Sequence, residues 1–247
     1  MNALRFLIPR LCYRYLFLYR IYYLLYRKGR GSKLLLPNEH TAFHIEGYPR
    51  SGNTFSYSLI RMILQSRSSF TFTHHTHATA SLIMAKRNNV PTIILIRHPL
   101  HAISSSYLKY YALRNQDVPD TVNIQLLQHE LKQYAIFYSY VVEHLADMKI
   151  IDFAGLIAYP FQFVKFVAKI VNVNPNELTV EELNKALTAI QDLEKRKNPL
   201  GSSLPNERKQ DRRQTIELLL KENALYQRCL KLYESACANK VNLEVQS

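Results

Sequence analysis

The chain has 247 residues, which is enough for one domain with a full hydrophobic core. Only 6 residues are Gly while Tyr, Leu and Ile are frequent, a globular composition that excludes a disordered chain. The net charge of +13 resides in two patches, +8 in residues 1–33 and +5 in residues 195–213, so a general basic coat is also excluded.

Composition also bears on partners and location. No recognised nucleic-acid-binding module accompanies the basic patches and the chain has no Trp, so we expect no nucleic-acid partner. The three cysteines, Cys12, Cys229 and Cys237, have neither the spacing of a disulfide framework nor that of a metal site. We therefore expect a reducing compartment and a cytoplasmic protein.

The N-terminal residues 4–26 are rich in aromatic residues and Leu, but Arg10, Arg14 and Arg20 interrupt them. A helix that spans a bilayer needs about 20 mostly apolar residues, so no transmembrane segment is expected here. Two interpretations stay open: an amphipathic helix that lies at a membrane surface, or one that packs on the domain with its Arg stems over apolar side chains. Residues 28–33 resemble a hinge.

From Thr41 onward, short apolar runs alternate with helical patterns, which is typical of βα units around a parallel sheet. We expect strands at 41–47, 70–73, 92–97 and 149–153, and helices at 52–66, 78–88, 99–112, 121–146, 161–171, 179–195 and from about 207 to 237. Thr179 and Glu182 have the spacing of a capping box. The predicted fold is α/β, a central parallel sheet flanked by helices as in P-loop nucleotide-binding proteins, over residues 34–247, after an N-terminal helix and hinge in residues 1–33.

The turn between the first strand and the first helix of this domain has the spacing of a phosphate-binding loop. Gly47 and Gly52 are separated by four residues and Thr54 follows, as in G-x-x-x-x-G-K-[ST], but Asn53 replaces Lys. That Lys contacts the outer phosphates of ATP or GTP. Here the cation is Arg50, inside the loop, so the sequence predicts an anion site without the residue needed for triphosphate turnover.

Two more polar clusters follow the next two strands. His74, His75 and His77 come after the second strand, and Arg97 ends the third. The carboxyl ends of parallel strands meet at one edge of a sheet, so we expect all three clusters to border one cleft. A neutral imidazole there can act as a general base. Carboxylates and cysteines are absent from the neighbouring sequence, so no metal site is expected.

Arg97 at the end of a buried strand requires an anionic partner. A Ser hydroxyl from the following helix, such as that of Ser105, would complete a small phosphate clamp with it. The alternative is a salt bridge to an acidic residue across the sheet.

Together the three clusters resemble the motifs of sulfotransferases that use 3′-phosphoadenylyl sulfate (PAPS). The segment 48–55 resembles the family's Y-P-K-S-G-T-T-W motif, the segment 75–77 its K-T-H-like segment, and Arg97 with Ser105 eight residues later its 3′-phosphate motif. The resemblance covers residues 43–112, and residues 149–171 more loosely. It implies a PAPS-dependent sulfotransferase that transfers the sulfuryl group to a hydroxyl of a small molecule, a glycan or a lipid-linked alcohol.

The resemblance also implies roles for the matching residues. PAPS binding is implied for Arg50, Ser51, Gly52, Asn53, Thr54, Phe55, Arg97 and Ser105. Arg50 would stabilise charge on the bridging oxygen and the sulfuryl group, and His77 would take the proton of the acceptor hydroxyl. Cationic side chains and N–H donors carry the charge in this scheme, so no metal is implied.

Several positions depart from the family pattern. His75 stands where the family has a cationic Lys, so its charge is expected to vary with pH. A C-terminal Gly-rich loop is not evident, and Arg208, Lys209 and Arg212 are expected to supply its phosphate contacts, the alternative being a solvated basic helix start. The choice of base among His74, His75 and His77 stays open, as does the acceptor.

Two other functions are compatible with the sequence. One is an ATP-dependent small-molecule kinase with a degenerate phosphate loop, which magnesium-dependent ATP consumption would indicate. The other is a non-catalytic nucleotide-binding or membrane-adaptor protein, which PAPS binding without transfer would indicate.

Overall fold

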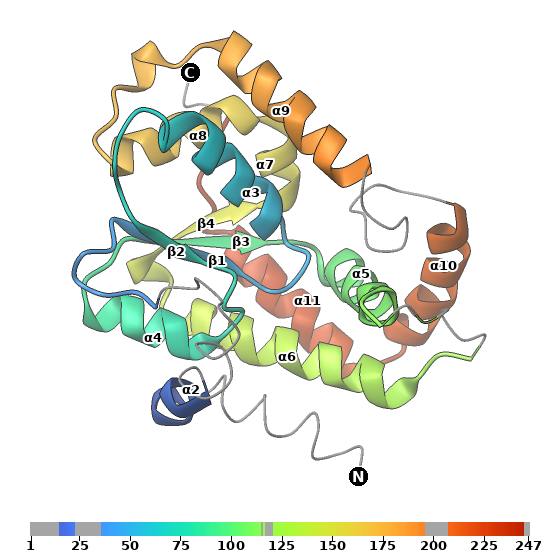
Figure 1. Cartoon of the computed structure of the whole chain (residues 1–247). Helices are drawn as coiled ribbons and strands as arrows, with labels where there is room; N and C mark the ends of the chain where they lie inside the picture. The colour runs from blue at the N-terminus through green and yellow to red at the C-terminus, as the bar shows by residue number, and fades with distance from the viewer. Residues whose placement is uncertain (1–14, 23–35, 115, 117–120, 196–206, 245–247) are drawn as a thin grey trace.

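A computed structural model describes residues 15–22, 36–114, 116, 121–195 and 207–244, with the backbone alone for residues 22, 195 and 207–213. Four strands form one parallel sheet in the order β2-β1-β3-β4 (Figure 1). They are β1 (Phe43–Gly47), β2 (Phe72–His74), β3 (Thr92–Ile96) and β4 (Met148–Asp152). The predicted α/β fold with a central parallel sheet is confirmed.

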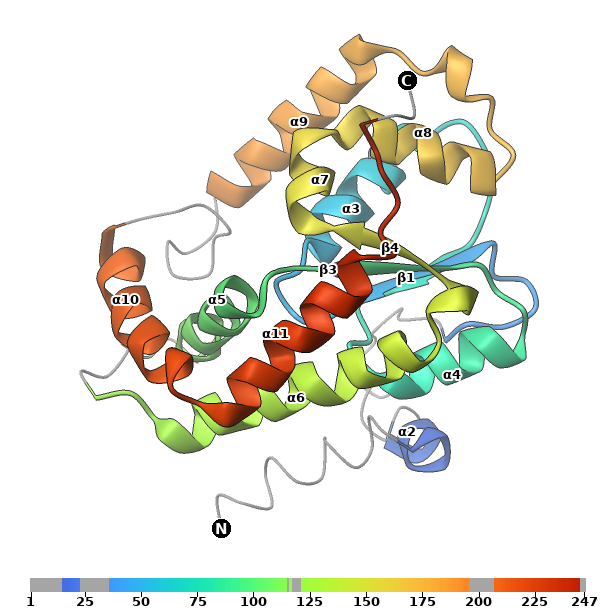
Figure 2. The ribbon, with the colours of Figure 1, turned by 180° about the vertical axis from the view of Figure 1, so that it is seen from behind.

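Helices cover both faces of the sheet (Figures 1 and 2). One layer contains α3 (Asn53–Leu59) with its π-helical continuation η3 (Ile60–Leu64), α7 (Phe153–Ala158), α8 (Pro160–Ile170) and α9 (Val180–Lys195). The other contains α4 (Thr79–Arg87), α5 (Pro99–Ala112), α6 (Ile124–Glu143), α10 (Glu207–Lys221) and α11 (Ala224–Cys237). Short 3₁₀ turns lie at Leu145–Asp147 and Pro175–Glu177.

The residues of β3 show why the sheet needs both layers. All five are buried, and successive side chains point to opposite faces. Ile93 and Leu95 pack in the cluster of the α3, α8 and α9 layer, whereas Ile94 and Ile96 pack in the cluster of the α5, α6 and α11 layer. A continuously apolar strand is therefore covered on both sides, as its sequence predicts.

Most predicted elements have the observed type, with strand ends within two residues of those expected. The single C-terminal helix expected from about 207 to 237 is wrong, because the chain forms α10 and α11 with a break at residues 222–223. The Asn223 side chain caps α11 by accepting a hydrogen bond from the Leu225 N–H, 3.0 Å away. Helix α7, directly after β4, was not predicted.

Of the N-terminal segment, the structure describes α2 (Leu16–Tyr22). Tyr19 is 1% exposed and packs against Ala78 and Ala80 at the start of α4, while Phe17 on the same helix is 73% exposed. One face of α2 thus packs on the domain and another faces outward. The expected domain boundary at residues 33 and 34 lies outside the described residues. Among the described residues, no helix is both long and apolar enough to cross a membrane.

Candidate active site

The carboxyl ends of β1, β2 and β3 bring the three polar clusters together, because each strand is followed by a short turn and a helix. The Arg50 Nε donates to Ser105 Oγ on α5, 2.9 Å away. The Arg97 Nη1 donates to the Arg50 carbonyl oxygen at 3.0 Å. His77 approaches the end of β1, with its Nδ1 2.7 Å from the Gly47 carbonyl oxygen. The turns after three separate strands therefore form one site.

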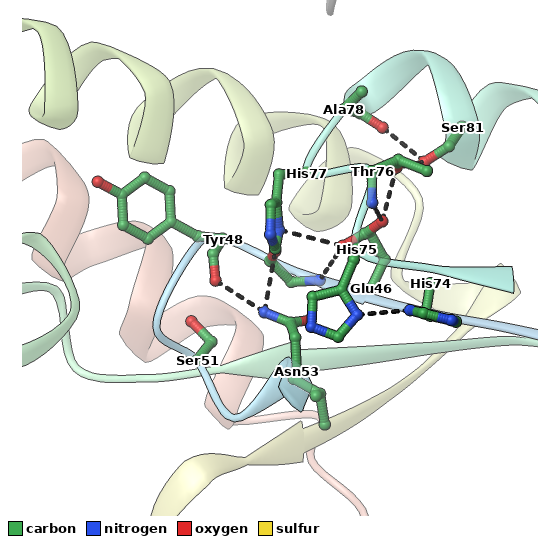
Figure 3. A network of polar contacts seen from close by, with 12 residues as sticks. Glu46, Tyr48, Ser51, Asn53, His74, His75, Thr76, His77, Ala78 and Ser81 are labelled. Atoms are coloured by element: carbon green, nitrogen blue, oxygen red, sulfur yellow. Dashed lines mark hydrogen bonds and ion pairs between the residues drawn. The ribbon is translucent and has the colours of Figure 1, made fainter. Parts of the chain in front are cut away.

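The turn between β1 and α3 is held by its own polar groups (Figure 3). The buried Asn53 amide donates to the carbonyl oxygens of Tyr48, at 3.1 Å, and of Gly47, at 3.4 Å. The Ser51 N–H donates to the Tyr48 carbonyl oxygen at 3.2 Å. The Ser51 hydroxyl is fully buried, 3.4 Å from the Tyr138 hydroxyl. The side chains of Ser51 and Asn53 thus stabilise the turn and do not face outward.

Backbone donors at the start of α3 remain for an anion. Ser56 makes the first bond of the helix ladder, from its N–H to the Gly52 carbonyl oxygen at 2.9 Å. The N–H groups of Asn53, Thr54 and Phe55 precede it and have no carbonyl partner within the helix, as at any helix start. They lie at the positive end of the helix dipole, so this end of the turn is suited to a phosphate.

The two glycines of the turn are required for different reasons. Gly52 has a φ of 99°, which only glycine adopts without strain, and a Cβ there would lie 2.8 Å from Leu156 Cδ2. A Cβ on Gly47 would lie 2.4 Å from the Leu95 carbonyl oxygen of β3. Gly47 is therefore required by the close approach of two strands.

Arg50 lies inside the site at a residue with a φ of 71°. Burial lowers the pKa of its guanidinium, and the negative charge of Glu194 in α9 opposes that effect. Arg97 places its guanidinium carbon 4.3 Å from the centre of the Phe153 ring, a cation–π distance. The Tyr134 hydroxyl holds the Arg97 carbonyl oxygen at 2.9 Å. Two guanidinium groups are thus anchored just beyond the ends of adjacent strands.

The three histidines differ in environment. The His75 Nε2 forms a hydrogen bond with Thr54 Oγ1, 3.2 Å away. The His75 Nδ1 contacts the Nδ1 of His74. Burial lowers the pKa of His74 to about 4. Burial, together with the neighbouring His77 and His74, lowers the pKa of His75 to about 3. With this lowered pKa, the charge of His75 changes at acidic pH and not near pH 7. His77 is partly exposed, with 24% of its side-chain surface accessible.

One contact of His77 was not anticipated from the sequence. Its Nδ1 lies 3.3 Å from Oε1 of Glu46, a carboxylate in β1 that is fully buried. A second unanticipated carboxylate, Glu130 of α6, accepts a hydrogen bond from the Tyr48 hydroxyl. An acidic residue within an apolar strand, as in His44-Ile45-Glu46-Gly47, is the sequence signal that could have indicated the first of these.

The remaining predicted site residues occupy other places. Phe55 is half-buried against the apolar cluster of the α3, α8 and α9 layer. Arg208, Lys209 and Arg212 fall in the first two turns of α10, and their side chains lie outside the described part of the structure. Within the residues described, no group of three or more His, Cys, Asp or Glu side chains is arranged to hold a metal ion.

Comparisons with known proteins agree with this architecture. No protein-family model matches the sequence, and no curated protein matches it. Among solved structures, the chain is similar to mouse sulfotransferase SULT7A1 complexed with PAP, with a TM-score of 0.52 and 12% sequence identity. The match covers 81% of this chain and 91% of that protein. The likeness shows that the chain has the fold of a sulfotransferase.

Proposed function

We propose that this chain with a sulfotransferase fold is a PAPS-dependent sulfotransferase that forms a sulfate ester on an acceptor hydroxyl. The observation that carries the proposal is the linkage of two guanidinium groups through the turn after β1: Arg50 to Ser105 at 2.9 Å, and Arg97 to the Arg50 carbonyl oxygen at 3.0 Å. PAPS carries anionic groups at both its 5′ and 3′ positions. Two anchored cations beyond the ends of adjacent strands suit such a donor.

In the proposed complex, the 5′-phosphate lies at the start of α3, where it accepts hydrogen bonds from the N–H groups of Asn53, Thr54 and Phe55. Arg97 binds the 3′-phosphate with Ser105. The structural likeness to a sulfotransferase complexed with PAP supports a donor of this class. PAP is the nucleotide that remains when PAPS loses its sulfuryl group.

The proposed reaction is an in-line displacement at sulfur. The acceptor oxygen attacks sulfur and forms the new S–O bond while the bond from sulfur to the bridging oxygen breaks, and PAP leaves with that electron pair. His77 takes the acceptor proton at Nε2, so the products are the sulfate ester of the acceptor, free PAP and a His77 imidazolium that later releases its proton. Arg50 stabilises the charge that develops on the bridging oxygen.

The position of Asn53 favours this proposal over a kinase. In phosphate loops that bind ATP, the Lys at that position projects to the outer phosphates. The Asn53 side chain is 6% exposed and donates to carbonyl oxygens of its own turn. The turn therefore uses this position for its own stability, and a cation for a γ-phosphate would have to come from elsewhere.

We also propose that the outward face of α2 contacts a membrane surface. The side chains of Phe17, Leu18 and Ile21 are 73%, 37% and 40% exposed. Contact of these apolar groups with water is unfavourable, and burial in a lipid headgroup region would remove that contact. Residues 1–33 contain eight basic residues and no acidic one, which complements anionic lipids. A glycan or lipid-linked acceptor would be consistent with this location.

Calorimetric titration with PAP and with magnesium ATP tests the proposed function. We expect PAP to bind at least about tenfold more tightly than ATP, and Arg97→Met to weaken PAP binding by about 10–100-fold, the loss expected for a charge-assisted contact. Arg228→Met is the matched control, since Arg228 is an exposed cation on α11 that donates to Ser139 Oγ. Tighter binding of ATP, or equal PAP binding by Arg97→Met and wild type, would contradict the proposal.

A further inference from the structure

Glu46 is a buried carboxylate directly behind His77. It lies on β1, between β2 and β3 in the sheet, and is 0% exposed. An ionised carboxylate can remain in such a place only when hydrogen-bond donors and positive charge compensate for the lost water. Its contacts therefore indicate what it does.

Both oxygens of the Glu46 carboxylate are engaged (Figure 3). Oε2 accepts from the Thr76 N–H and from the Thr76 hydroxyl, each at 2.6 Å. Oε1 accepts from the Gly47 N–H at 3.1 Å and lies 3.3 Å from His77 Nδ1. Burial raises the pKa of Glu46, but the hydrogen bond and charge of His77, with lesser effects of His44 and Thr76, outweigh it and the net pKa is lowered. The carboxylate is therefore ionised.

These contacts determine the tautomer of His77. Its Nδ1 faces two acceptors, the Gly47 carbonyl oxygen at 2.7 Å and Glu46 Oε1 at 3.3 Å. A ring nitrogen between two acceptors must carry the hydrogen. In the neutral ring the lone pair then belongs to Nε2, the nitrogen that a general base needs.

We propose that Glu46 is a positioning residue for the general base His77: it fixes the Nδ1–H tautomer and stabilises the imidazolium formed when Nε2 takes the acceptor proton. The inference rests on the proposed sulfotransferase function. A carboxylate 3.3 Å from the ring, shielded from water, interacts strongly with the cation that forms in the reaction. Thr76 ties the same carboxylate to the residue next to His77, so ring and carboxylate keep a constant separation.

The other charged and titratable groups around His77 do not take this role. His44 of β1 is buried, which lowers its pKa and keeps it neutral. His74 and His75, on the same turn, have pKa values of about 4 and about 3, and Lys109 of α5 acts on His75 with a positive charge. None of these groups offers His77 a negative charge, whereas Glu46 does.

A purely structural role for Glu46 would use some of the same contacts. The carboxylate ties the turn after β2 to β1, and both His75 and His77 in that turn have positive φ, 58° and 53°. A turn anchor and a positioning residue would both lose stability on substitution. Only the protonation of His77 distinguishes them.

The test is nitrogen-15 NMR of the histidine rings in the full chain saturated with PAP, comparing wild type with Glu46→Gln. In the wild type we expect neutral His77 as the Nδ1–H tautomer. In Glu46→Gln the amide oxygen is expected to stay with the two Thr76 donors, which turns the NH₂ group towards His77 Nδ1. That nitrogen then faces one donor and one acceptor, the Gly47 carbonyl oxygen, so the Nε2–H form should gain population.

His44→Gln is the matched control, because His44 is also fully buried on β1 and faces the same side of the sheet two residues away. It should change stability without changing the tautomer of His77. An unchanged tautomer population of His77 in Glu46→Gln would overturn the inference. If that variant does not fold, wild-type His77 found in the Nε2–H form would overturn it as well.

The same samples separate the two proposals. PAP binding measured by calorimetry reports on the sulfotransferase proposal, and the ring signals of His77 report on Glu46. PAP binding with an unaltered His77 in Glu46→Gln would refute the role of Glu46 alone. A wild-type chain that does not bind PAP would refute the proposed function, whatever tautomer its His77 adopts.

Discussion

The Arg97 guanidinium donates to the main-chain carbonyl oxygen of Arg50, 3.0 Å away, so the side chain of one cation supports the backbone of the other. Arg97 directly follows β3 and Arg50 lies in the turn after β1, and these two strands are hydrogen-bonded neighbours. The two cations therefore cannot shift independently. A change at Arg97 should also loosen the turn that presents Arg50.

Arg50 itself should matter more for transfer than for nucleotide binding. We expect Arg50→Met to reduce the release of PAP from PAPS by about 10²–10³-fold, the usual cost of losing one donor to developing charge. PAP binding should change less, because PAP lacks the sulfuryl group. Arg50→Lys should retain part of the activity, since Lys keeps the charge. The measurement is PAP release with a panel of sugars and simple alcohols, and equal rates for Arg50→Met and wild type would exclude the proposed role.

Substitution of the two glycines Gly52 and Gly155 should have opposite effects on stability. Gly52→Ala places a Cβ 2.8 Å from Leu156 Cδ2 at a φ of 99°, so we expect it to lower the free energy of unfolding by about 1–3 kcal/mol. Gly155→Ala, in helix α7, places its Cβ where no atom lies within 4 Å and should raise that free energy by up to about 1 kcal/mol. Urea unfolding followed by circular dichroism measures both. The same sign for both variants would contradict the geometry of the turn.

Acidification should destabilise the fold through His75. Its pKa is about 3 in the folded chain, against an ordinary value of 6.5. Between these values the unfolded chain binds a proton that the folded chain does not, so stability is full above pH 6.5 and decreases as the pH falls towards 3. We expect His75→Asn to reduce the acid-induced loss in the free energy of unfolding by about 1–3 kcal/mol. His40→Asn, at an exposed histidine, should leave that loss unchanged. Chemical unfolding at a series of pH values provides the comparison.

Membrane contact through α2 is tested with vesicles. The full chain should sediment with phosphatidylserine–phosphatidylcholine vesicles at low salt and less with phosphatidylcholine alone, because basic residues are attracted to anionic lipids. Phe17→Glu should reduce this binding, since Phe17 is 73% exposed. Leu113→Glu is the control, because Leu113 is similarly exposed, at 71%, at the end of α5. Equal losses in the two variants would argue against a specific role for α2.

Local sequence signals predicted much of the fold correctly. Thr179 and Glu182 form the expected capping box, with the Thr179 N–H 3.0 Å from the Glu182 carboxylate and the Glu182 N–H 3.2 Å from the Thr179 hydroxyl. The break before α11 was missed because no Gly or Pro interrupts residues 207–237. Asn223 marks that break, but its cap depends on a local geometry that periodicity does not contain.

The site was predictable where its residues follow strands and not where they lie within them. Arg50, His77 and Arg97 come directly after strands, so the parallel-sheet pattern alone brings them to one edge. The inward orientation of Asn53 and the pairing of Glu46 with His77 depend on burial and on contacts between separate strands. Spacing along the chain does not contain that information.

The positive φ angles of Arg50, His75 and His77, at 71°, 58° and 53°, restrict how the site can be altered. A β-branched residue such as Val at any of them would be strained by its backbone before its chemistry was tested. In a randomised library, selection at these three positions would first recover residues that tolerate a left-handed backbone, mainly Gly, Asn and Asp. Enrichment of Asn there would show only that Asn adopts a positive φ easily. Residues that adopt a positive φ equally well would have to be compared with one another to learn about the reaction.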